Sequence, residues 1–327
     1  MLAFRRRFRS PSCCLAALML CATAYAQQPI YPARPVRLIV PFAPGGGTDI
    51  VARIVAQKAG ELLRQSIVVD NRGGAGGLIG TEIAVRALPD GYTLGIVTAS
   101  LPISAAASRV PFDPVRDLTL ISMIGETGYL ITMHPALPVR TTKELIAYAK
   151  ANPGKVTYGS SGTGGTAHLS GELFDLLAGT RTVHVPYKSS GPALTDLLAG
   201  QISMIYGSLP VVVPHMSSGR LRVVSITTSK RSRALPAVPT IAESGIPGYD
   251  ALTWYGLMGP RGLQKDAASR WQTIIRESMQ SRELKERFDA DGLDYPELGP
   301  EYFGTVLKRD IAKWTKVVQA ANIKLAQ

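Results

Sequence analysis

Short apolar, β-branched runs alternate with longer amphipathic segments along most of the chain. The runs are typical of buried strands. They occupy residues 36–40, 67–70, 93–98, 121–124, 129–133, 156–158, 183–185, 202–206 and 223–227. The clearest amphipathic segment follows the first run, where Val51, Val55, Ala59 and Leu62 form one apolar stripe at helical spacing. Further helices are predicted at residues 143–151, 165–177, 192–199, 267–279 and 301–321. Strands interleaved with helices predict an α/β protein with largely parallel sheets.

One local pattern occurs twice: a strand, a glycine-rich turn and the start of a helix. The first copy covers residues 38–49 and the second covers residues 156–168. Turns of this kind lie at the carboxyl end of a strand, where open α/β sheets bind ligands. If each copy belongs to its own sheet, the two turns face each other across a cleft.

Both turns have the properties of an anion site. A helix N-terminus presents unpaired backbone N–H groups and a partial positive charge, and glycine lets an anion approach closely. The side chains that would cap these helices or hold an anion are Thr48, Asp49, Ser160, Ser161, Thr163 and Thr166. Two opposed sites would suit a small molecule with carboxylate groups. The alternative is that each turn only starts a helix and binds nothing.

The first 26 residues differ from the rest of the chain. Arginines at positions 5, 6, 7 and 9 precede an apolar run at residues 13–24, and Ala24-Tyr25-Ala26 follows, so this segment reads as a secretory signal peptide. All three cysteines lie in it, so the mature chain has no disulfides and depends on packed cores. Cys21 raises the alternative of lipid attachment, but the bulky Leu20 before it is unfavourable. No later run is long and apolar enough to span a membrane, which predicts a soluble periplasmic protein.

Length and charge narrow the function further. The chain has 327 residues, which predicts about two domains. Its net charge is +12, but four of the arginines belong to the signal segment. The basic cluster at residues 220–233 would steer anionic ligands, or it is a solvated surface. Because no dense basic stripe with interleaved aromatic residues is present, nucleic-acid binding is not expected.

Motifs for cofactors and catalysis are incomplete. The Gly154-Lys155-Val156 segment lacks the Ser or Thr of a phosphate-binding loop, and Ile79 stands where a dinucleotide motif needs its third glycine. Thr163 stands where a serine-hydrolase turn around Ser161 needs glycine. The four histidines do not have metal-ligand spacing. We therefore predict no cofactor, no metal and no catalytic residue.

Two side chains have open roles at this stage. His168 lies near a helix start, where it would donate to a ligand or tie down the turn. Trp254, like the other two tryptophans, is expected in the core, but it is the one that could instead face a ligand.

Several segments together resemble one known family. They begin with Pro-Phe-Ala-Pro-Gly-Gly-Gly-Thr-Asp at residues 41–49, and the others are residues 69–80, 89–94, 159–168, 185–188 and 238–248. This order of motifs resembles the Bug-type extracytoplasmic solute receptors of tripartite tricarboxylate transporters, over nearly all of the chain after residue 26.

The resemblance implies a two-domain α/β fold of the periplasmic binding protein class (type 2-like). Two mainly parallel sheets are joined by two crossing strands, and the ligand lies in the interdomain cleft. We expect the first domain to comprise residues 27–127 and 249–327 and the second residues 128–248, with hinges near residues 125–129 and 222–228. Whether the C-terminal helix packs on the first or the second domain stays open.

The resemblance also implies which residues bind the ligand. The first turn and the strand after it contribute Phe42, Ala43, Gly46, Gly47, Thr48, Asp49, Ala99 and Ser100. The second turn and its surroundings contribute Ser160, Ser161, Thr163, Gly164, His168, Tyr187, Tyr206 and Gly207. Family members often carry an aspartate where this chain has Gly207. Without that acceptor, we expect amino acids to bind more weakly than plain dicarboxylates or aromatic carboxylates.

The function implied is that of a monomeric periplasmic receptor. It would bind a small organic carboxylate (a di- or tricarboxylate or an aromatic acid) by domain closure and deliver it to membrane transporter subunits. Two alternatives remain: a module that presents its ligand to a membrane sensor kinase, and an envelope hydrolase on the same fold.

Overall fold

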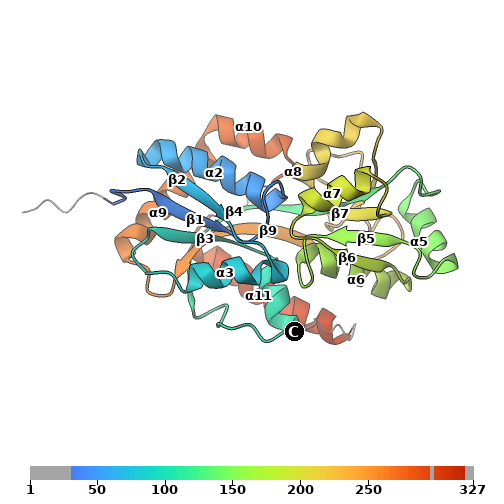
Figure 1. Cartoon of the computed structure of the whole chain (residues 1–327), viewed down its shortest axis with the longest axis horizontal. Coiled ribbons are helices and arrows are strands. Elements are labelled where there is room, and N and C mark those ends of the chain that lie inside the picture. The colour runs from blue at the N-terminus through green and yellow to red at the C-terminus, as the bar shows by residue number, and fades with distance from the viewer. Residues whose placement is uncertain (1–30, 295–297, 321–327) are drawn as a thin grey trace, which may run out of the picture.

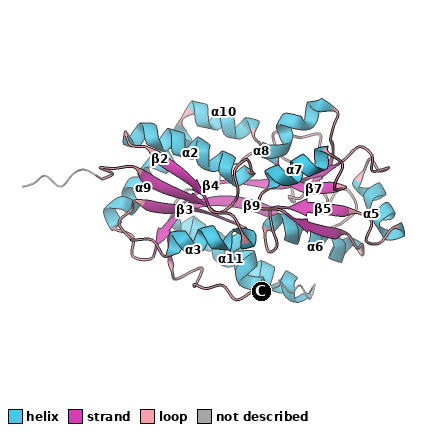
Figure 2. Cartoon of the chain, viewed as in Figure 1, coloured by secondary structure: helices cyan, strands magenta, loops and turns pink. Residues whose placement is uncertain are grey.

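The computed structural model describes residues 31–294 and 298–320. The predicted signal peptide at residues 1–26 lies outside the described residues. Helices cover both faces of a curved central sheet, which extends through two lobes (Figures 1 and 2).

The first lobe is built around a parallel core of three strands. Its strands are β1 (Val36–Val40), β2 (Ile67–Asn71), β3 (Thr93–Thr98) and β9 (Leu252–Pro260). Its helices are α2 (Gly47–Leu63), η1 (Ala75–Gly77), α3 (Leu78–Val85), α4 (Ser100–Ala107), α9 (Lys265–Gln280) and α10 (Arg282–Ala290). Strand β1 pairs in parallel with β2 and β3, and β9 runs antiparallel to β3.

The second lobe repeats this plan. Its strands are β5 (Thr157–Ser160), β6 (Val183–Pro186), β7 (Met204–Ser208) and β8 (Arg222–Ile226). Its helices are α5 (Thr142–Ala151), α6 (Thr166–Ala178), α7 (Ser190–Leu198), α8 (Leu209–Val212) and η2 (Val213–Ser218). Strand β5 pairs in parallel with β6 and β7.

A long strand runs through both lobes. Strand β4 (Leu118–Met133) pairs with β9 as far as Gly128 opposite Leu252, and from Tyr129 onward it pairs with β7 and β8. All of these pairings are antiparallel. The predicted α/β fold class is confirmed, but the sheet is mixed rather than mainly parallel, and β9 pairs with β3 and with the first-lobe part of β4 instead of crossing between the lobes. The predicted domain boundaries agree with this arrangement but stay a prediction.

The second predicted hinge, at residues 222–228, stays a prediction. Residues 222–226 form β8 inside the second lobe, and the chain returns to the first lobe where β9 begins, at Leu252. The sequence pattern did not predict β9, because Gly256, Gly259 and Pro260 resemble loop residues. Packing explains Gly256: the ring of Phe303 lies where a side chain at this position would be.

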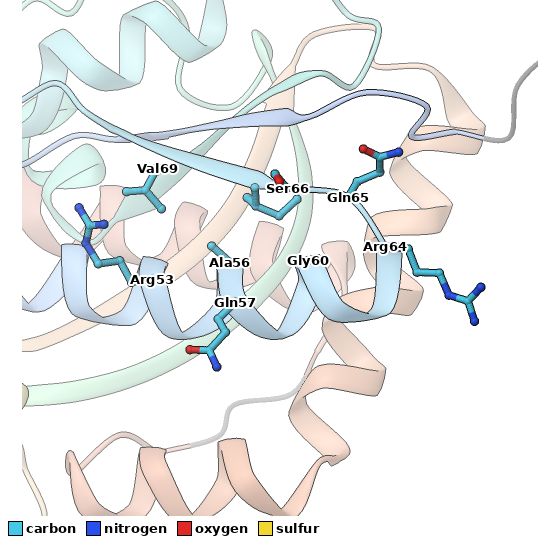
Figure 3. Close-up of a pocket in the computed structure, with 9 residues that line it drawn as sticks. Arg53, Ala56, Gln57, Gly60, Arg64, Gln65, Ser66 and Val69 are labelled. Atoms are coloured by element: carbon cyan, nitrogen blue, oxygen red, sulfur yellow. The ribbon is translucent and has the colours of Figure 1, made fainter.

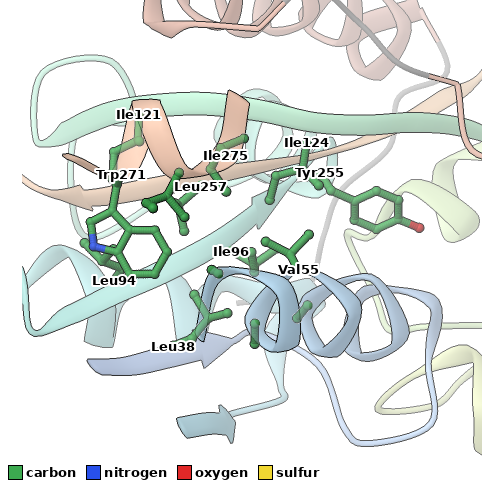
Figure 4. Packing of buried hydrophobic residues seen from close by; sticks show 14 of the residues in the cluster. Leu38, Val55, Leu94, Ile96, Ile121, Ile124, Tyr255, Leu257, Trp271 and Ile275 are labelled. Atoms are coloured by element: carbon green, nitrogen blue, oxygen red, sulfur yellow. The ribbon is translucent and has the colours of Figure 1, made fainter. Parts of the chain in front are cut away.

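Each lobe has its own hydrophobic core. In the first lobe, residues of α2 and α9 pack against the sheet. Figure 4 shows Val55 of α2 beside Ile96 and Trp271 of α9 beside Leu94. In the second lobe, Tyr158 and Phe174 lie in a separate cluster between the sheet and its helices. Each Å² of apolar surface that is buried contributes about 25 cal/mol to the stability of the fold. The two cores therefore stabilise the chain without disulfides.

The C-terminal helix α11 (Pro300–Ala320) contacts both lobes, which answers the question of where it packs. Phe303, Val306 and Leu307 belong to a first-lobe cluster, whereas Trp314 and Val318 belong to the second-lobe core. Trp254 is fully buried and donates a 2.7 Å hydrogen bond from Nε1 to Asp310 of this helix, so it is a core residue. Among the residues described, no helix combines the length and the apolar character that crossing a membrane requires.

Candidate functional site

A small cavity lies between the lobes, at the carboxyl ends of β1, β3, β5 and β7. The first lobe and β4 line it with Phe42, Gly46, Gly47, Thr48, Thr98, Tyr129, Thr253 and Tyr255. The second lobe lines it with Ser161, Ser189, Ser190 and Ser208. Its volume is about 20 Å³, which is room for about one water molecule. The lobes are therefore nearly closed on each other.

Two helix N-termini meet at this cavity. Helix α2 follows Gly46 and helix α7 follows Ser189, and neither has a side-chain cap. A Cβ added to Gly46 would lie 2.8 Å from Cβ of Ser189 and 3.6 Å from the backbone nitrogen of Ser190. The backbone donors of both helices, with their partial positive charge, are thus brought to one point.

Ser189 is the most informative side chain of the site. It is 1% exposed, and its Oγ has no hydrogen-bond partner within the described part of the chain. A buried hydroxyl without a partner is costly, because its desolvation is not compensated. Together with the uncapped helices, it indicates a place where a polar ligand completes the hydrogen bonding.

The rest of the lining is polar but uncharged. Ser190 and Ser208 lie with their Oγ atoms 3.5 Å apart, and Phe42 adds an apolar face. Tyr255 sits at one end of the first-lobe cluster, with its hydroxyl directed away from it (Figure 4). Burial raises the pKa of both Tyr129 and Tyr255, so both phenols stay neutral. No lining residue is acidic or basic.

The first glycine turn lies at the cavity as predicted, through Phe42, Gly46, Gly47 and Thr48. Asp49 has another role. Its carboxylate accepts hydrogen bonds from the Gly45 N–H, from Arg53 and from Asn71 at 2.9–3.0 Å. Burial opposes ionisation of Asp49, but these hydrogen bonds lower its pKa below the usual value. Asp49 therefore stabilises the conformation of the turn and does not line the cavity.

The second glycine turn contributes only Ser161 to the cavity lining. His168 ties the turn down: its Nδ1 accepts a hydrogen bond from the Gly164 N–H at 3.2 Å. Ser160 Oγ lies 2.6 Å from Nε2 of His184, and Thr163 is exposed. These contacts hold the turn within its own lobe.

Three predicted site residues, Ala43, Ser100 and Gly164, contact the opposite lobe instead of lining the cavity. The Ala43 N–H donates to the carbonyl of Lys188 at 3.1 Å, across the lobes. Ser100 Oγ accepts a 3.2 Å hydrogen bond from the Thr166 N–H. Ser104, one turn further along α4, lies 3.5 Å from the carbonyl of Gly164. Ala99 precedes α4 and donates to Trp254 O within the first lobe.

The last three predicted residues lie away from the cavity. Tyr187 donates to Asp196 at 2.7 Å, and burial together with this carboxylate raises its pKa to about 12. Tyr206 is 1% exposed and packs edge-on against Tyr158 in the second-lobe core. A side chain at Gly207 would meet Val212 and Ile205, so an aspartate there would point into the core. The expected role of Gly207 in ligand preference is therefore not supported.

Sequence reasoning missed several lining residues, namely Thr98, Tyr129, Ser189, Ser190, Ser208, Thr253 and Tyr255. A signal was present for one pair, since Ser189-Ser190 lies just before the helix predicted at residues 192–199, where serine is a common N-cap residue. Thr253 and Tyr255 were missed together with β9.

A larger open hollow of about 690 Å³ lies on the outer surface of the first lobe, between α2 and β2 (Figure 3). The side chains of Gln57 and Arg64 extend away from β2 in this view, so no set of polar groups converges there. In residues 31–294 and 298–320, no cluster of His, Cys, Asp and Glu could hold a metal ion.

Comparison with known families gives a match over most of the chain. The family described as "Tripartite tricarboxylate transporter family receptor" matches residues 51–323. Among curated proteins, the chain is 38% identical to Protein BugT of Bordetella pertussis over 311 residues, which is 93% of this chain and 95% of that protein.

Solved structures agree with this match. An R. palustris protein with adipate superposes with a TM-score of 0.86 at 34% identity, covering 90% of this chain and 99% of that one. MatC from Rhodopseudomonas palustris with bound malate gives a TM-score of 0.84 at 27% identity, covering 88% of this chain and 100% of that one. The periplasmic binding protein BugD gives 0.86 at 30% identity, covering 90% and 99%.

Proposed function

The chain belongs to the tripartite tricarboxylate transporter receptor family, and on that premise we propose that it captures a small organic carboxylate in the periplasm. It then presents the ligand to membrane transporter subunits. The proposal treats the protein as a monomer, without a catalytic step, a cofactor or a nucleic-acid partner. We also propose that its two domains are residues 27–127 with 249–327, and residues 128–248, as expected from the sequence.

The main support comes from helices α2 and α7, whose N-termini lack side-chain caps and meet at an uncharged cavity. The Ser189 hydroxyl, which has no hydrogen-bond partner among the described residues, lies at the same place. Carboxylates are well suited to such a place, because backbone N–H groups and the helix dipole favour negative charge. Two of the similar solved structures contain a dicarboxylate, adipate in one and malate in the other, which supports the same ligand class here.

The geometry favours one carboxylate at this junction rather than one at each glycine turn. Gly46 and Ser189 are too close for a ligand to span the distance between them. A single carboxylate group would accept from the N-termini of α2 and α7 and from Ser189 Oγ. The rest of the ligand would extend toward Phe42, Tyr129 and Ser161.

The ligand needs the lobes further apart than they are in this structure, both to enter and to stay bound, because a cavity of about 20 Å³ has room for about one water molecule. The chain crosses between the lobes near Gly128 and Leu252, so we place the hinge there. Closure over the ligand would then bring the α7 terminus onto the α2 terminus.

The cavity also supports a ligand preference. Its lining includes no Asp or Glu, so an ammonium group would lose its hydration without gaining a carboxylate partner. Plain dicarboxylates or aromatic acids should therefore bind more tightly than amino acids. The expected preference for plain acids thus rests on the uncharged lining of the cavity and not on the absence of an aspartate at Gly207.

A thermal-shift screen of the chain from residue 27 onward tests the proposal. The panel contains succinate, malate, adipate, citrate, benzoate and aspartate. At 100 times its Kd a ligand adds about 2.7 kcal/mol of stability. At least one plain acid should raise Tm clearly, and no shift with any acid would contradict the proposal. Deleting the neighbouring transporter genes separates transport, in which uptake is lost, from ligand-presenting sensing, in which only induction is affected.

A further inference from the structure

We propose that Glu172 is a positioning residue for ligand binding, and that it acts through the imidazole of His168 on the turn before α6, residues 160–166. Neither side chain lines the cavity, but the turn that they hold carries Ser161, which does. This inference rests on the proposed function, because it concerns the affinity of the same site.

The backbone of this turn has little stiffness of its own. Three of its seven residues are glycine, and Gly162 and Gly164 have positive φ angles of 126° and 80°. Because glycine has no Cβ, such a turn has many accessible conformations unless hydrogen bonds select one. Ser161 makes no hydrogen bond within the part of the chain that the structure describes. Its hydroxyl and N–H are therefore available to a ligand, and its position depends on its neighbours.

His168 fixes one of these neighbours. Its Nδ1 accepts the Gly164 N–H at 3.2 Å, and the residue is 7% exposed. A ring nitrogen that accepts carries no hydrogen, so the hydrogen of the neutral imidazole is on Nε2. The other tautomer would set two N–H groups against each other. The tautomer of His168 therefore decides whether Gly164 is held.

Glu172 selects that tautomer. It lies one helical turn after His168 in α6, with Oε1 3.5 Å from His168 Nε2. The contact with His168 holds the pKa of Glu172 below its usual value, although burial acts in the opposite direction. Glu172 is thus ionised at neutral pH and can only accept, which favours hydrogen on the Nε2 that faces it.

Tyr158 keeps the carboxylate in place. Its hydroxyl donates to Glu172 Oε1 at 3.0 Å, and the residue is fully buried. Burial raises the pKa of Tyr158, so the phenol keeps its proton and remains a donor. Glu172 is 34% exposed, and this hydrogen bond keeps it turned toward His168 instead of toward solvent.

His184 fixes the turn on the other side of Ser161. Its ring stacks on that of His168 with centroids 3.9 Å apart, and its Nε2 lies 2.6 Å from Ser160 Oγ. Ser160 Oγ also accepts the Gly162 N–H at 3.1 Å. The two stacked rings thus support the backbone both before and after Ser161.

Affinity depends on the fraction of molecules in which the turn is correctly placed. The apparent Kd rises by the inverse of that fraction. Loss of the acceptor at His168 frees a turn with three glycines, so we expect the Kd for a plain acid to rise at least about fivefold. Glu172→Ala lets both tautomers of His168 form and lets its ring turn, so it should raise the Kd about threefold.

Variants of similar shape separate the hydrogen bond from packing. His168→Phe keeps a ring that stacks on His184 but removes the acceptor, so it should weaken binding. His168→Asn places an amide oxygen near the position of Nδ1, which accepts the Gly164 N–H without any choice of tautomer. It should bind within about twofold of the wild type. In the His168→Asn background, Glu172→Ala should change the Kd by less than about 1.5-fold, since its effect passes through the imidazole.

Two matched controls report general damage. Nδ1 of His134 also accepts a backbone N–H at 3.2 Å, from Ala136, and His134 does not line the cavity. His134→Phe therefore loses the same kind of hydrogen bond elsewhere. Glu82 is 35% exposed and, like Glu172, contacts a residue four positions away, Arg86. Glu82→Ala should leave the Kd unchanged.

Two measurements decide the question. Calorimetry with succinate, malate, adipate, citrate and benzoate gives the Kd values, and ¹⁵N NMR of the histidine side chains reports the tautomer. The wild type should carry its His168 hydrogen on Nε2, and Glu172→Ala should show a mixture of tautomers. Hydrogen on Nδ1 in the wild type would overturn the inference.

The Kd values can also overturn it. They do so if His168→Phe binds like His134→Phe, or if Glu172→Ala has the same effect with His168 and with Asn at that position. If His168→Phe does not fold, the two Glu172→Ala backgrounds and the tautomer still decide. A wild-type chain that binds none of the five acids contradicts the proposed function, and the tautomer then tests the positioning role by itself.

Discussion

The imidazole rings of His168 and His184 stack with centroids 3.9 Å apart, directly beneath the turn that precedes α6. His184 Nε2 lies 2.6 Å from Ser160 Oγ, and His168 faces Glu172 with its Nε2 3.5 Å from the carboxylate. Two imidazoles in contact disfavour a second positive charge. The pair lies against the turn before α6, through the contact of His184 with Ser160.

The first prediction concerns acid stability. Burial, followed by the neighbouring His168, lowers the pKa of His184 to about 3, against 6.5 for an ordinary histidine. Between these values the unfolded chain binds the additional proton, so the free energy of unfolding falls as pH drops below about 6.5. Tyr158 and Glu172 also face this pair, and Glu172 partly offsets the effect.

The check is Tm measured from pH 4 to pH 8. Replacing the imidazole by His184→Gln should flatten the fall in Tm between pH 6.5 and pH 4. His134→Gln is the control, because His134 lies outside this pair. Parallel curves for wild type and His184→Gln would show that the stacked pair does not titrate as described.

The second prediction compares two buried serines. Ser189 and Ser278 both have an Oγ without a hydrogen-bond partner in the described residues, but only Ser189 lines the cavity. A hydrogen bond to a charged ligand contributes about 1.5–3 kcal/mol. Ser189→Ala should therefore weaken carboxylate binding by at least tenfold in calorimetry, with little loss of Tm in the unliganded protein. Ser278→Ala should leave the Kd unchanged, and a similar Kd for both variants would contradict the assignment.

The third prediction separates stability from affinity. Gly191 is the second residue of α7, where alanine favours the helix by up to about 1 kcal/mol. A Cβ there would lie 2.9 Å from the carbonyl oxygen of Gly45 in the opposite lobe. Gly191→Ala should raise the Tm of the unliganded protein and weaken ligand binding.

Helix α11 provides the control for this prediction. At Gly304 the nearest atom to an added Cβ is Leu120 Cδ1 at 3.8 Å. Gly304→Ala should raise Tm with no change in Kd. If Gly191→Ala binds as tightly as Gly304→Ala, close approach of Gly45 and Gly191 is not needed for binding.

The fourth prediction concerns the buried carboxylate of the first turn. Asp49 is 4% exposed and accepts from the Gly45 N–H, Arg53 and Asn71. Asp49→Asn loses the charge that these donors need, and we expect a loss of about 1–3 kcal/mol in unfolding free energy. Asp113→Asn, at a partly exposed turn where the carboxylate accepts from the N–H groups of Val115 and Arg116, should cost less in the same urea titration. Equal midpoints would contradict the structural role of Asp49.

The first glycine turn was predictable because local chemistry decides it. A strand, three glycines and Thr48-Asp49 need no distant partner to form a helix start. The fold class followed from alternating strands and helices, and most of their bounds agree within two residues.

The remaining features depend on distant contacts. Ser189 resembles any N-cap until α7 is placed against α2. The second turn contacts Gly76 and Ser100 of the opposite lobe, which its own sequence does not reveal. Strand β9 was hidden because its glycines make room for the Phe303 ring. In each case the deciding neighbour lies far away in sequence.

Calorimetric titration of the chain from residue 27 onward with adipate, malate and aspartate tests the central claim most directly. The claim is that an uncharged cavity between the α2 and α7 termini binds a plain carboxylate by lobe closure. At least one of the two plain acids should bind with a Kd at least tenfold below that of aspartate. Tighter binding of aspartate, or no binding of either plain acid, would contradict it.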